Sequence, residues 1–244
     1  MTTRADGRKP DEIRATKIRR GYLRHAEGSV MIETGLTRVI CSATLEDKVP
    51  PFRRQANGGW VTAEYGMIPR SSATRIRREV GAQGLQGRTF EIQRLIGRSL
   101  RAVTDLKRLG PRTVLVDCDV IQADGGTRTA AVTGAYVALA DAVRYLMRQG
   151  VLTESPLVDS VAAVSVGIVD GEAVLDLDYG EDVRAEVDMN VVMTGSGRYV
   201  ELQGTAEGTP FADADLGRML ELARAGVLRL TAAQKEALGA EGAR

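Results

Sequence analysis

The sequence contains a single histidine, His25, and only two cysteines, Cys41 and Cys118. A Ser/His/Asp triad or a zinc site of several histidines would have to be built around His25 alone. His25 lies in the polar stretch YLRHAEGS, so we expect it to have a structural or surface role. There is no CxxC motif, and each cysteine lies in a β-rich stretch, which favours two buried thiols over a disulfide or a metal pair. Nucleophilic acyl transfer is therefore not expected.

The sequence also has no long hydrophobic run. No apolar stretch approaches the roughly 20 residues that span a bilayer, and the polar start MTTRADGRKPDEIR has no apolar segment of the kind found in secretion signals. We therefore expect a cytoplasmic protein without membrane contact. Neither GxxxxGK[ST] nor a helix-opening GxGxxG is present, which excludes the familiar phosphate loops for nucleoside triphosphates and dinucleotides. At 244 residues the chain is long enough for one large domain or two packed halves.

The net charge of +1 conceals a strong segregation of charge along the chain. Residues 51–101 hold ten arginines and three glutamates, with no lysine or aspartate. Residues 170–188 hold eight carboxylates and one arginine, Arg184. Each cluster alone could be an ordinary solvated face. Two opposite clusters in a nearly neutral chain suggest that the protein binds both a polyanion and a metal ion.

The first half combines strands, a basic loop and helices. GSVMIETG and TRVICSATLE have the alternation of a β-hairpin that turns at Gly35 and Leu36. Residues 70–88 are rich in arginine and lack periodicity, which predicts a mobile basic loop. From Arg88 to Arg108 apolar residues recur at helical spacing, and a basic stripe follows the same helix at Arg94, Arg98 and Arg101. A strand (113–123) and an Ala-rich helix follow.

The second half repeats this plan. Four strands are expected in AAVSVGIVDG, EAVLDLDY, NVVMTGSG and YVELQGTAEG. A helix is expected around Leu216 to Ala225, and a final helix from Thr231, which forms a capping box with Gln234. The order β-β, helix, β, helix in each half suggests an internal duplication of an α/β unit, although the two halves share little sequence.

A Gly-Gly-Thr-Arg run at residues 125–128 has the composition of an anion site. Glycines let a backbone approach a ligand closely, and the helix that follows would direct its free N–H groups to the same place. Thr127 adds a hydroxyl and Arg128 a bidentate guanidinium. Arg88 could complete the pocket if it folds nearby. The alternative is a plain strand-to-helix turn with Thr127 as the N-cap.

The acidic segment offers a counterpart in YGEDVRAEVDMN. Asp182 and Asp188 are too far apart for one helical face, but a bent loop could bring them together to share Mg²⁺. One of them could instead act as a general acid, with a pKa raised by its neighbours. A solvated acidic loop is the third possibility.

Several longer strings resemble one family, the bacterial ribonuclease PH family. The resemblance extends from HAEGSV to the last helix. It is carried by TAEYGMIPRS (62–71), GRTFEIQRLIGRSLRA (87–102), DCDVIQADGGTRTAAVTGA (117–135), AEVDMNVVMTGSG (185–197) and ELQGTAEGTPF (201–211).

The resemblance implies an α/β fold of α+β two-layer type, a duplicated β-β-α-β-α unit like ribosomal protein S5 domain 2. It implies a single domain over 1–244 with two halves, about 10–150 and about 156–244, and assembly as a homohexamer of three dimers. The implied activity is phosphorolytic 3′-to-5′ trimming of precursor tRNA beyond its CCA end. Inorganic phosphate is the co-substrate, Mg²⁺ the metal, and nucleoside diphosphates the products and the substrates of the reverse reaction. Ribosomal RNA is a further substrate compatible with the family.

The resemblance also implies roles for individual residues. The phosphate site maps to Arg88, Gly126, Thr127 and Arg128. The catalytic set maps to Arg128, Asp182 and Asp188, of which the two aspartates are also the metal ligands. The general acid is expected to be either Asp182 or a metal-bound water. Where some relatives have a lysine, this chain has Asn190, so no third electrophilic side chain is expected there. The expected tRNA contacts are Arg70, Arg75, Arg77 and Arg78 in the basic loop, with Arg94 and Arg98 on the helix.

Two other functions compete with this one. The chain could be a catalytically silent RNA-binding subunit of a ring, but it retains the phosphate-site and carboxylate residues together. It could be a small-molecule phosphotransferase, but the arginine-rich loop is excessive for a small substrate.

Overall fold

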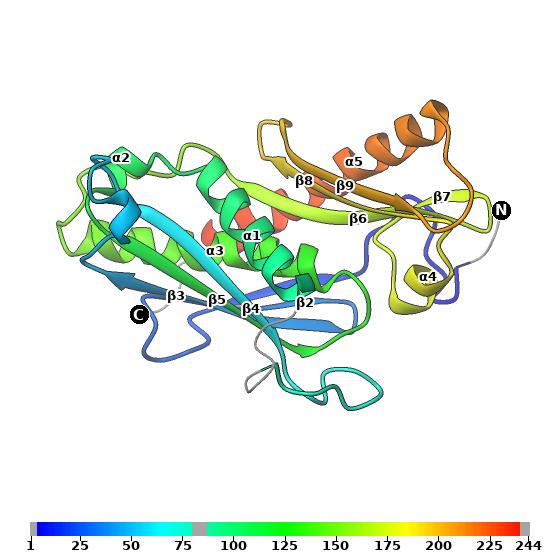
Figure 1. Cartoon of the computed structure of the whole chain (residues 1–244), viewed down its shortest axis with the longest axis horizontal. Coiled ribbons are helices and arrows are strands. Elements are labelled where there is room, and N and C mark those ends of the chain that lie inside the picture. The colour runs from blue at the N-terminus through cyan, green and yellow to red at the C-terminus, as the bar shows by residue number, and fades with distance from the viewer. Residues whose placement is uncertain (1–3, 80–86, 240–244) are drawn as a thin grey trace.

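The computed structural model describes residues 4–79 and 87–239, which form two β-sheets and the helices packed on them (Figure 1). The first sheet has the strand order β1-β2-β3-β5-β4 and the second β7-β6-β8-β9. The strands are β1 (Thr16–Arg20), β2 (Gly28–Thr34), β3 (Thr37–Glu46), β4 (Trp60–Met67), β5 (Thr113–Gln122), β6 (Val161–Val169), β7 (Glu172–Leu175), β8 (Val187–Thr194) and β9 (Tyr199–Ala206). The helices are α1 (Gly87–Ala102), α2 (Leu106–Leu109), α3 (Thr127–Arg148), α4 (Tyr179–Arg184) and α5 (Asp213–Gly239), with a short 3-10 turn η1 (Pro51–Arg53).

Helix α3 joins the two halves. It packs on β2, β3 and β5 of the first sheet and on β6 of the second, and it is buried along most of its length. Strand β6 is buried at every position because helices cover both of its faces. Val161 and Ala163 belong to the core that includes α3, whereas Val164 and Val166 pack with residues of α5. The halves therefore share a core.

One pairing in the first sheet is parallel, and it positions the candidate site. Strands β4 and β5 run side by side in the same direction, while the other pairs in this sheet are antiparallel. Helix α1 follows β4 and helix α3 follows β5, so both helices begin near the same edge of the sheet. Ligands commonly bind at the carboxyl ends of parallel strands, where the N-termini of the following helices meet.

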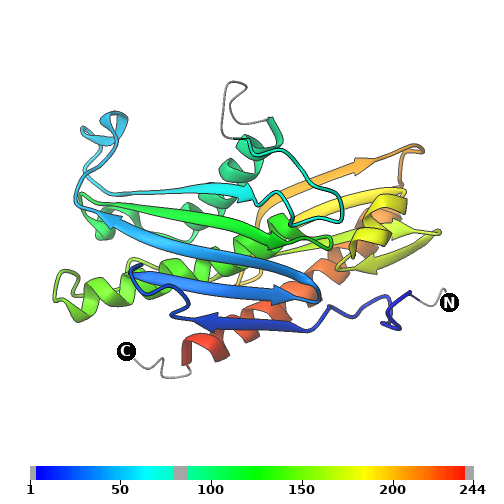
Figure 2. The same cartoon turned by 90° about the horizontal axis from the view of Figure 1, so that it is seen from below.

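The N-terminal segment crosses from the first half to the second. Both views place the start of the chain beside β7 and α4, from where it leads to β1 at the edge of the first sheet (Figures 1 and 2). The backbone N–H of Leu175 in β7 donates to Pro10 O at 2.8 Å. Residues before the first strand therefore contact the acidic segment of the second half.

The hairpin, the strand before the Gly-Gly-Thr-Arg run and the four strands of the second half are confirmed. Cys41 and Cys118 are buried free thiols, directly opposite each other in β3 and β5. The sequence patterns did not predict β1 or β4. Strand β1 has the sequence TKIRR, whose side chains alternate between half-buried and exposed positions at a sheet edge. No helix among the described residues is long and apolar enough to cross a membrane.

The helix expected from Arg88 to Arg108 is wrong in its extent. Helix α1 ends at Ala102, and Asp105 caps the separate helix α2 by accepting hydrogen bonds from the N–H groups of Lys107 and Arg108. The apolar residues that suggested continuity, such as Val103, are buried in the turn instead. A capping aspartate inside a periodic pattern was the signal that a new helix begins.

The final helix expected from Thr231 is also wrong, because α5 is one continuous helix. The Thr231 hydroxyl donates back to Val227 O at 2.9 Å, as hydroxyls do inside helices, and makes no N-cap. Gln234 is fully buried, and its amide donates to Thr133 O and Val161 O, each at 2.9 Å. Of the pair that resembled a capping box, Thr231 bonds within α5 and Gln234 ties α5 to α3 and β6.

Gly28 should tolerate no side chain, because α3 crosses β2 at this point. A Cβ on Gly28 would lie 2.0 Å from Ala138 O and 2.9 Å from Ala142 N. We expect Gly28→Ala to lower the free energy of unfolding in urea by more than about 2 kcal/mol, because backbone must move. Gly217→Ala is the matched control, since nothing lies within 4 Å of that position in α5. It should stabilise by about 0.5–1 kcal/mol. Equal effects at both positions would contradict this packing.

Candidate active site

A cleft of about 970 Å³ lies between the two halves. The first half contributes Arg88 from the start of α1 and residues Asp124 to Arg128, which lead into α3. The second half contributes Asp182 from α4 and Asp188 from β8, among others. The residues that the sequence proposed for the phosphate and metal sites therefore line one cavity, although they lie up to 100 positions apart in the chain.

The Gly-Gly-Thr-Arg run forms the N-terminus of α3. Gly125 and Gly126 have φ of +71° and +63°, and Gly126 rather than Thr127 is the N-cap, so the alternative of a Thr127 cap is wrong. Both values lie in the left-handed region that glycine adopts readily. A Cβ on Gly125 would lie 2.6 Å from Leu177 O, because the loop packs directly against the backbone that leads into α4. The Gly-Gly-Thr-Arg run is thus in contact with the residues that lead into α4, the helix that carries Asp182.

Thr127 is oriented by Tyr65 of β4. The buried Tyr65 hydroxyl donates to Thr127 Oγ1 at 2.9 Å. Burial raises the pKa of Tyr65, although the hydrogen bond to Thr127 and the charges of Arg88 and Arg128 oppose that rise. The phenol therefore stays protonated, and the Thr127 hydroxyl can donate its own hydrogen to an anion in the cleft. The sequence pattern singled out the string that contains Tyr65 without assigning it this role.

Arg128 is held by two side chains from other elements. Its Nη1 donates to Gln203 Oε1 of β9 at 2.8 Å and to Glu91 Oε1 of α1 at 3.2 Å. The Gln203 amide also donates to Glu91. No described residue accepts a hydrogen bond from Nε or Nη2 of Arg128, so this edge of the guanidinium is available to a ligand. The sequence did not single out Glu91 or Gln203 as positioning groups.

Asp182 and Asp188 have perturbed pKa values because they share this cleft. Burial raises the pKa of Asp188 to about 6, and the neighbouring charge of Asp182 contributes to the rise. Burial also raises the pKa of Asp182. In both cases the positive charges of Arg88 and Arg128 oppose the rise. The arginines and carboxylates are therefore close enough to interact electrostatically.

The donor chemistry of this pair suits a hard cation. Two carboxylates whose charges disfavour each other can be neutralised by one Mg²⁺, which commonly uses one or two carboxylates and keeps several waters. Within residues 4–79 and 87–239, no group of three or more His, Cys, Asp or Glu side chains is arranged to hold a metal. Asp182 and Asp188, which line the cleft, could hold such an ion as a pair with water completing its coordination, and Asn190, which is 7% exposed, lines the same cleft.

The expected RNA-binding arginines lie outside the centre of the cleft. Arg70, Arg75, Arg77 and Arg78 are exposed in the described part of the loop between β4 and α1, whereas residues 80–86 of this loop lie outside the described chain. Arg77 and Arg78 line a second pocket of about 340 Å³ together with carboxylates of β4 and β5. The basic stripe on α1 is divided among different partners. Arg94 is exposed, Arg98 pairs with Glu201 at 2.5 Å, and Arg101 lies over the Trp60 ring at 4.4 Å.

The raised pKa of Asp188 should appear in the pH dependence of stability. The unfolded carboxyl ionises near pH 4, while the folded one keeps its proton up to about pH 6, so this stabilisation is lost as pH rises through that window. Asp188→Asn mimics the neutral acid. In a buffer that contains a metal chelator, we expect this variant to raise the free energy of unfolding by about 1–2 kcal/mol at pH 7.5. At pH 4 the free energy of unfolding should change little.

Asp47→Asn, which alters a side chain that is 93% exposed, controls for the change in net charge. Urea titrations at both pH values provide the measurement. Equal destabilisation by Asp188→Asn at pH 4 and pH 7.5 would show that the ionised carboxylate carries no penalty in the fold.

Comparison with known proteins identifies the family. The model for the 3′ exoribonuclease family, domain 1, matches residues 12–144, and that for domain 2 matches residues 159–226. Ribonuclease PH of Corynebacterium efficiens is 60% identical over 237 residues, which cover 97% of each chain.

Two solved structures share the fold at low sequence identity. Rice (Oryza sativa) Rrp46 superposes with a TM-score of 0.78 at 19% identity, over 96% of this chain and all of that chain. A chain of the Archaeoglobus fulgidus exosome with RNA bound to the active site gives 0.76 at 20% identity, over 94% of this chain and 91% of that one. These structures support the duplicated fold like ribosomal protein S5 domain 2. With the family match over both halves, the chain belongs to the 3′ exoribonuclease family, as a phosphate-dependent enzyme of the ribonuclease PH type.

Proposed function

We propose that the cleft carries out phosphorolysis at the 3′ end of precursor tRNA, with inorganic phosphate as the nucleophile and nucleoside 5′-diphosphates as products. One observation carries the proposal. A helix N-terminus with Thr127, Arg128 and Arg88 lines the same cleft as the carboxylates of Asp182 and Asp188. A single site can thus hold an anionic nucleophile beside a group able to give up a proton.

The main physical obstacle is repulsion between two anions. Inorganic phosphate and the terminal phosphodiester both carry negative charge, so they approach only where cations neutralise them. Arg88 and Arg128 supply positive charge, and the N-terminus of α3 adds its partial positive charge. Thr127 donates one hydrogen bond, and Gly126 permits close backbone approach. These residues form the proposed phosphate site.

In the chemical step, a phosphate oxygen attacks the terminal phosphorus and the bond from phosphorus to the 3′ oxygen of the shortened RNA breaks. The leaving oxygen requires a proton. Asp182 is the proposed donor, because it lines the cleft and is the more exposed of the two aspartates, so a leaving group can reach it. Its pKa is raised by the partial burial of its carboxyl, which favours the protonated form that a donor needs. Mg²⁺ held by Asp182 and Asp188 would supply further positive charge for the transferring group. No covalent intermediate with the enzyme is needed.

A diester is exchanged for a diphosphate without hydrolysis, so the reaction is reversible. Abundant nucleoside diphosphates should therefore drive extension of RNA. The residues of the basic loop, Arg70, Arg75, Arg77 and Arg78, are proposed to hold the body of the tRNA, with Arg94 and Arg98 on α1 as further contacts. Trimming of ribosomal RNA would use the same site.

The proposal extends to organisation and location. Both halves contribute residues that line the cleft, which supports a single domain of two halves, about 10–150 and about 156–244. Assembly as a homohexamer of three dimers and a cytoplasmic location follow from the family resemblance. Two unpaired thiols and an RNA substrate are consistent with that compartment. A catalytically silent ring subunit is disfavoured, because all six residues of the phosphate and carboxylate sets line the cleft.

The products of digestion test the proposal directly. Incubation of the protein with a 3′-extended tRNA, Mg²⁺ and graded phosphate should shorten the RNA in proportion to bound phosphate and release nucleoside diphosphates. Thin-layer or ion-exchange separation of the products measures this outcome. Release of nucleoside monophosphates, or equal shortening without phosphate, would mean that water is the nucleophile. In the same assay Arg128→Ala should abolish shortening and leave tRNA binding largely intact.

The basic loop should control binding rather than chemistry. Replacing Arg70, Arg75 and Arg78 together by alanine should weaken tRNA binding and reduce the slope of log Kd against log salt by about 2–3, since each phosphate contact adds roughly one counterion. Filter binding between low and moderate salt measures the slope. Glu46→Gln and Lys48→Ala alter an exposed ion pair elsewhere and serve as a control. An unchanged slope in the triple variant would remove the loop from the tRNA interface.

A further inference from the structure

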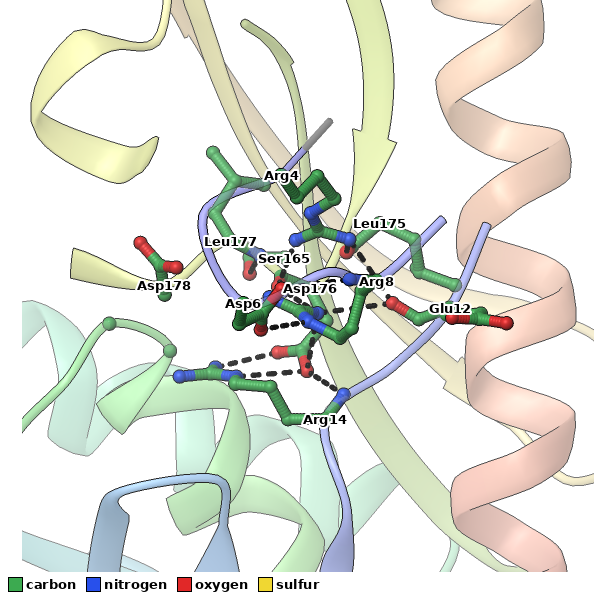
Figure 3. Close-up of polar contacts among 12 residues, drawn as sticks. Arg4, Asp6, Arg8, Glu12, Arg14, Ser165, Leu175, Asp176, Leu177 and Asp178 are labelled. Carbon is green, nitrogen blue, oxygen red and sulfur yellow. Dashed lines mark hydrogen bonds and ion pairs between the residues drawn. The ribbon is translucent and has the colours of Figure 1, made fainter. Parts of the chain in front are cut away.

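The segment before β1 carries three arginines whose side chains are nearly buried. Arg4, Arg8 and Arg14 are 3%, 10% and 5% exposed. Arginine is rarely buried to this degree unless it is paired. Figure 3 shows their guanidinium groups converging on the backbone and side chains around Asp176, between β7 and α4. No local sequence pattern connects these arginines with the acidic segment 170–188, since Arg14 and Asp176 are 162 positions apart and Arg4 and Glu181 are 177 apart.

Arg14 forms a two-pronged ion pair, called a fork below, with Asp176. It also contacts the residue before the Gly-Gly-Thr-Arg run, which is called the phosphate loop below. Its Nη2 and Nε donate to the two Asp176 oxygens at 2.6 and 3.0 Å, and its backbone N–H donates to Asp176 Oδ2 at 2.7 Å. Its Nη1 donates to the carbonyl oxygen of Asp124, which directly precedes Gly125 and Gly126. One guanidinium thus joins the end of β5 to the end of β7.

Arg4 makes a second fork, on the helix that carries Asp182. Its Nε and Nη2 each donate to the Glu181 carboxylate at 2.6 Å, while Nη1 donates to Leu175 O at 2.8 Å and Nη2 to Asp176 O at 2.9 Å. Glu181 also closes a capping box with Asp178 at the start of α4. Glu181 directly precedes Asp182 in the sequence, so this pair fixes the turn from which Asp182 projects.

Neither Arg4 nor Arg14 lines the cleft, yet both hold backbone next to residues that do. Arg14 holds the residue before the Gly-Gly-Thr-Arg run, and Arg4 holds the residue before Asp182. The two loops touch at Gly125, where a Cβ would lie 2.6 Å from Leu177 O. The distance from the phosphate site to the proton donor therefore depends on the N-terminal segment.

We propose that Arg14, supported by Arg4, is a positioning residue for phosphorolysis: its fork on Asp176 fixes the phosphate loop relative to Asp182. This inference rests on the function proposed above. Small displacements of reacting groups lower rates steeply, so a loosened fork should affect the chemical step and phosphate binding more than RNA binding. The basic loop that is proposed to hold tRNA leaves the sheet at β4, and none of its described residues shares a hydrogen bond or an ion pair with Arg14.

The test uses Arg14→Lys, Arg14→Gln, Asp176→Asn and the double variant Arg14→Gln/Asp176→Asn in the full chain. Asparagine tolerates the φ of +56° at position 176. All are assayed at a temperature at which circular dichroism shows them folded. We expect Arg14→Gln to lower kcat by about 10- to 100-fold and to raise KM for phosphate, with KM for tRNA changed less than about twofold.

Lysine keeps the charge but cannot form the fork, so Arg14→Lys should recover only part of kcat. Asp176→Asn should resemble Arg14→Gln, and the double variant should be little worse than either single one, because both changes break the same pair. Wild-type kcat and phosphate KM in Arg14→Lys and Asp176→Asn would overturn the proposal, even if Arg14→Gln failed to fold. A loss explained entirely by a smaller folded fraction would overturn it as well.

Arg19→Gln is the matched control, since Arg19 makes an exposed ion pair with Glu33 in the neighbouring part of the chain. It should leave every parameter unchanged. A second readout does not depend on activity: inorganic phosphate should raise the melting temperature of the wild type more than that of Arg14→Gln or Arg14→Lys. Equal rises would refute the positioning role. Absence of phosphate-dependent shortening in the wild type would instead refute the proposed function.

Discussion

The buried pairing between N-terminal arginines and acidic residues of the second half is the interaction on which the site depends. Arg14 with Asp176 and Arg4 with Glu181 form two-pronged ion pairs at 2.6 Å that are at most 5% exposed. Removing one partner of such a pair typically costs about 3–5 kcal/mol, because a charge is left buried without compensation. The pairs also impose geometry, since each guanidinium donates two parallel N–H hydrogen bonds to a carboxylate that lies in its own plane. These ion pairs thereby hold the loop that contains Gly125 against the residues that lead into α4.

The same pairs change what the acidic segment means. Residues 170–188 carry eight carboxylates, and as a solvated face or a metal site all of them would be available to cations. Asp176 and Glu181 instead form buried ion pairs with Arg14 and Arg4. Within this segment, Asp182 and Asp188 are the carboxylates that line the cleft. Burial raises the pKa of both, and the charge of Asp182 adds to the rise at Asp188. Two carboxylates of the segment therefore stabilise the fold, and two others line the cleft, where they could take part in a reaction.

The residues proposed to touch ligand could be found from the sequence because they occur in short, dense motifs. Arg88, Thr127 and Arg128 belong to strings whose chemistry is local, and the cleft brings them together as expected. Their supporting residues could not be found in this way. These supporting residues contact partners in other elements or in the other half of the chain, as Tyr65, Glu91, Gln203 and Arg14 do. A local sequence pattern does not indicate which distant residue will lie next to them. The helix errors have a related origin, because Thr231 and Gln234 fit a capping box locally, whereas tertiary contacts with α3 and β6 extend the helix.

The parallel pairing of β4 and β5 explains why one cleft can hold so much like charge. It places the N-termini of α1 and α3 at one edge of the sheet, so Arg88 and Arg128 approach from separate helices while glycines keep the backbone open between them. Both arginines are positively charged, and Glu91 offsets part of this charge by its contact with Arg128. In the proposed function, inorganic phosphate bound between them would offset more of it. Binding of the nucleophile would thereby stabilise the loops that are proposed to receive the RNA end.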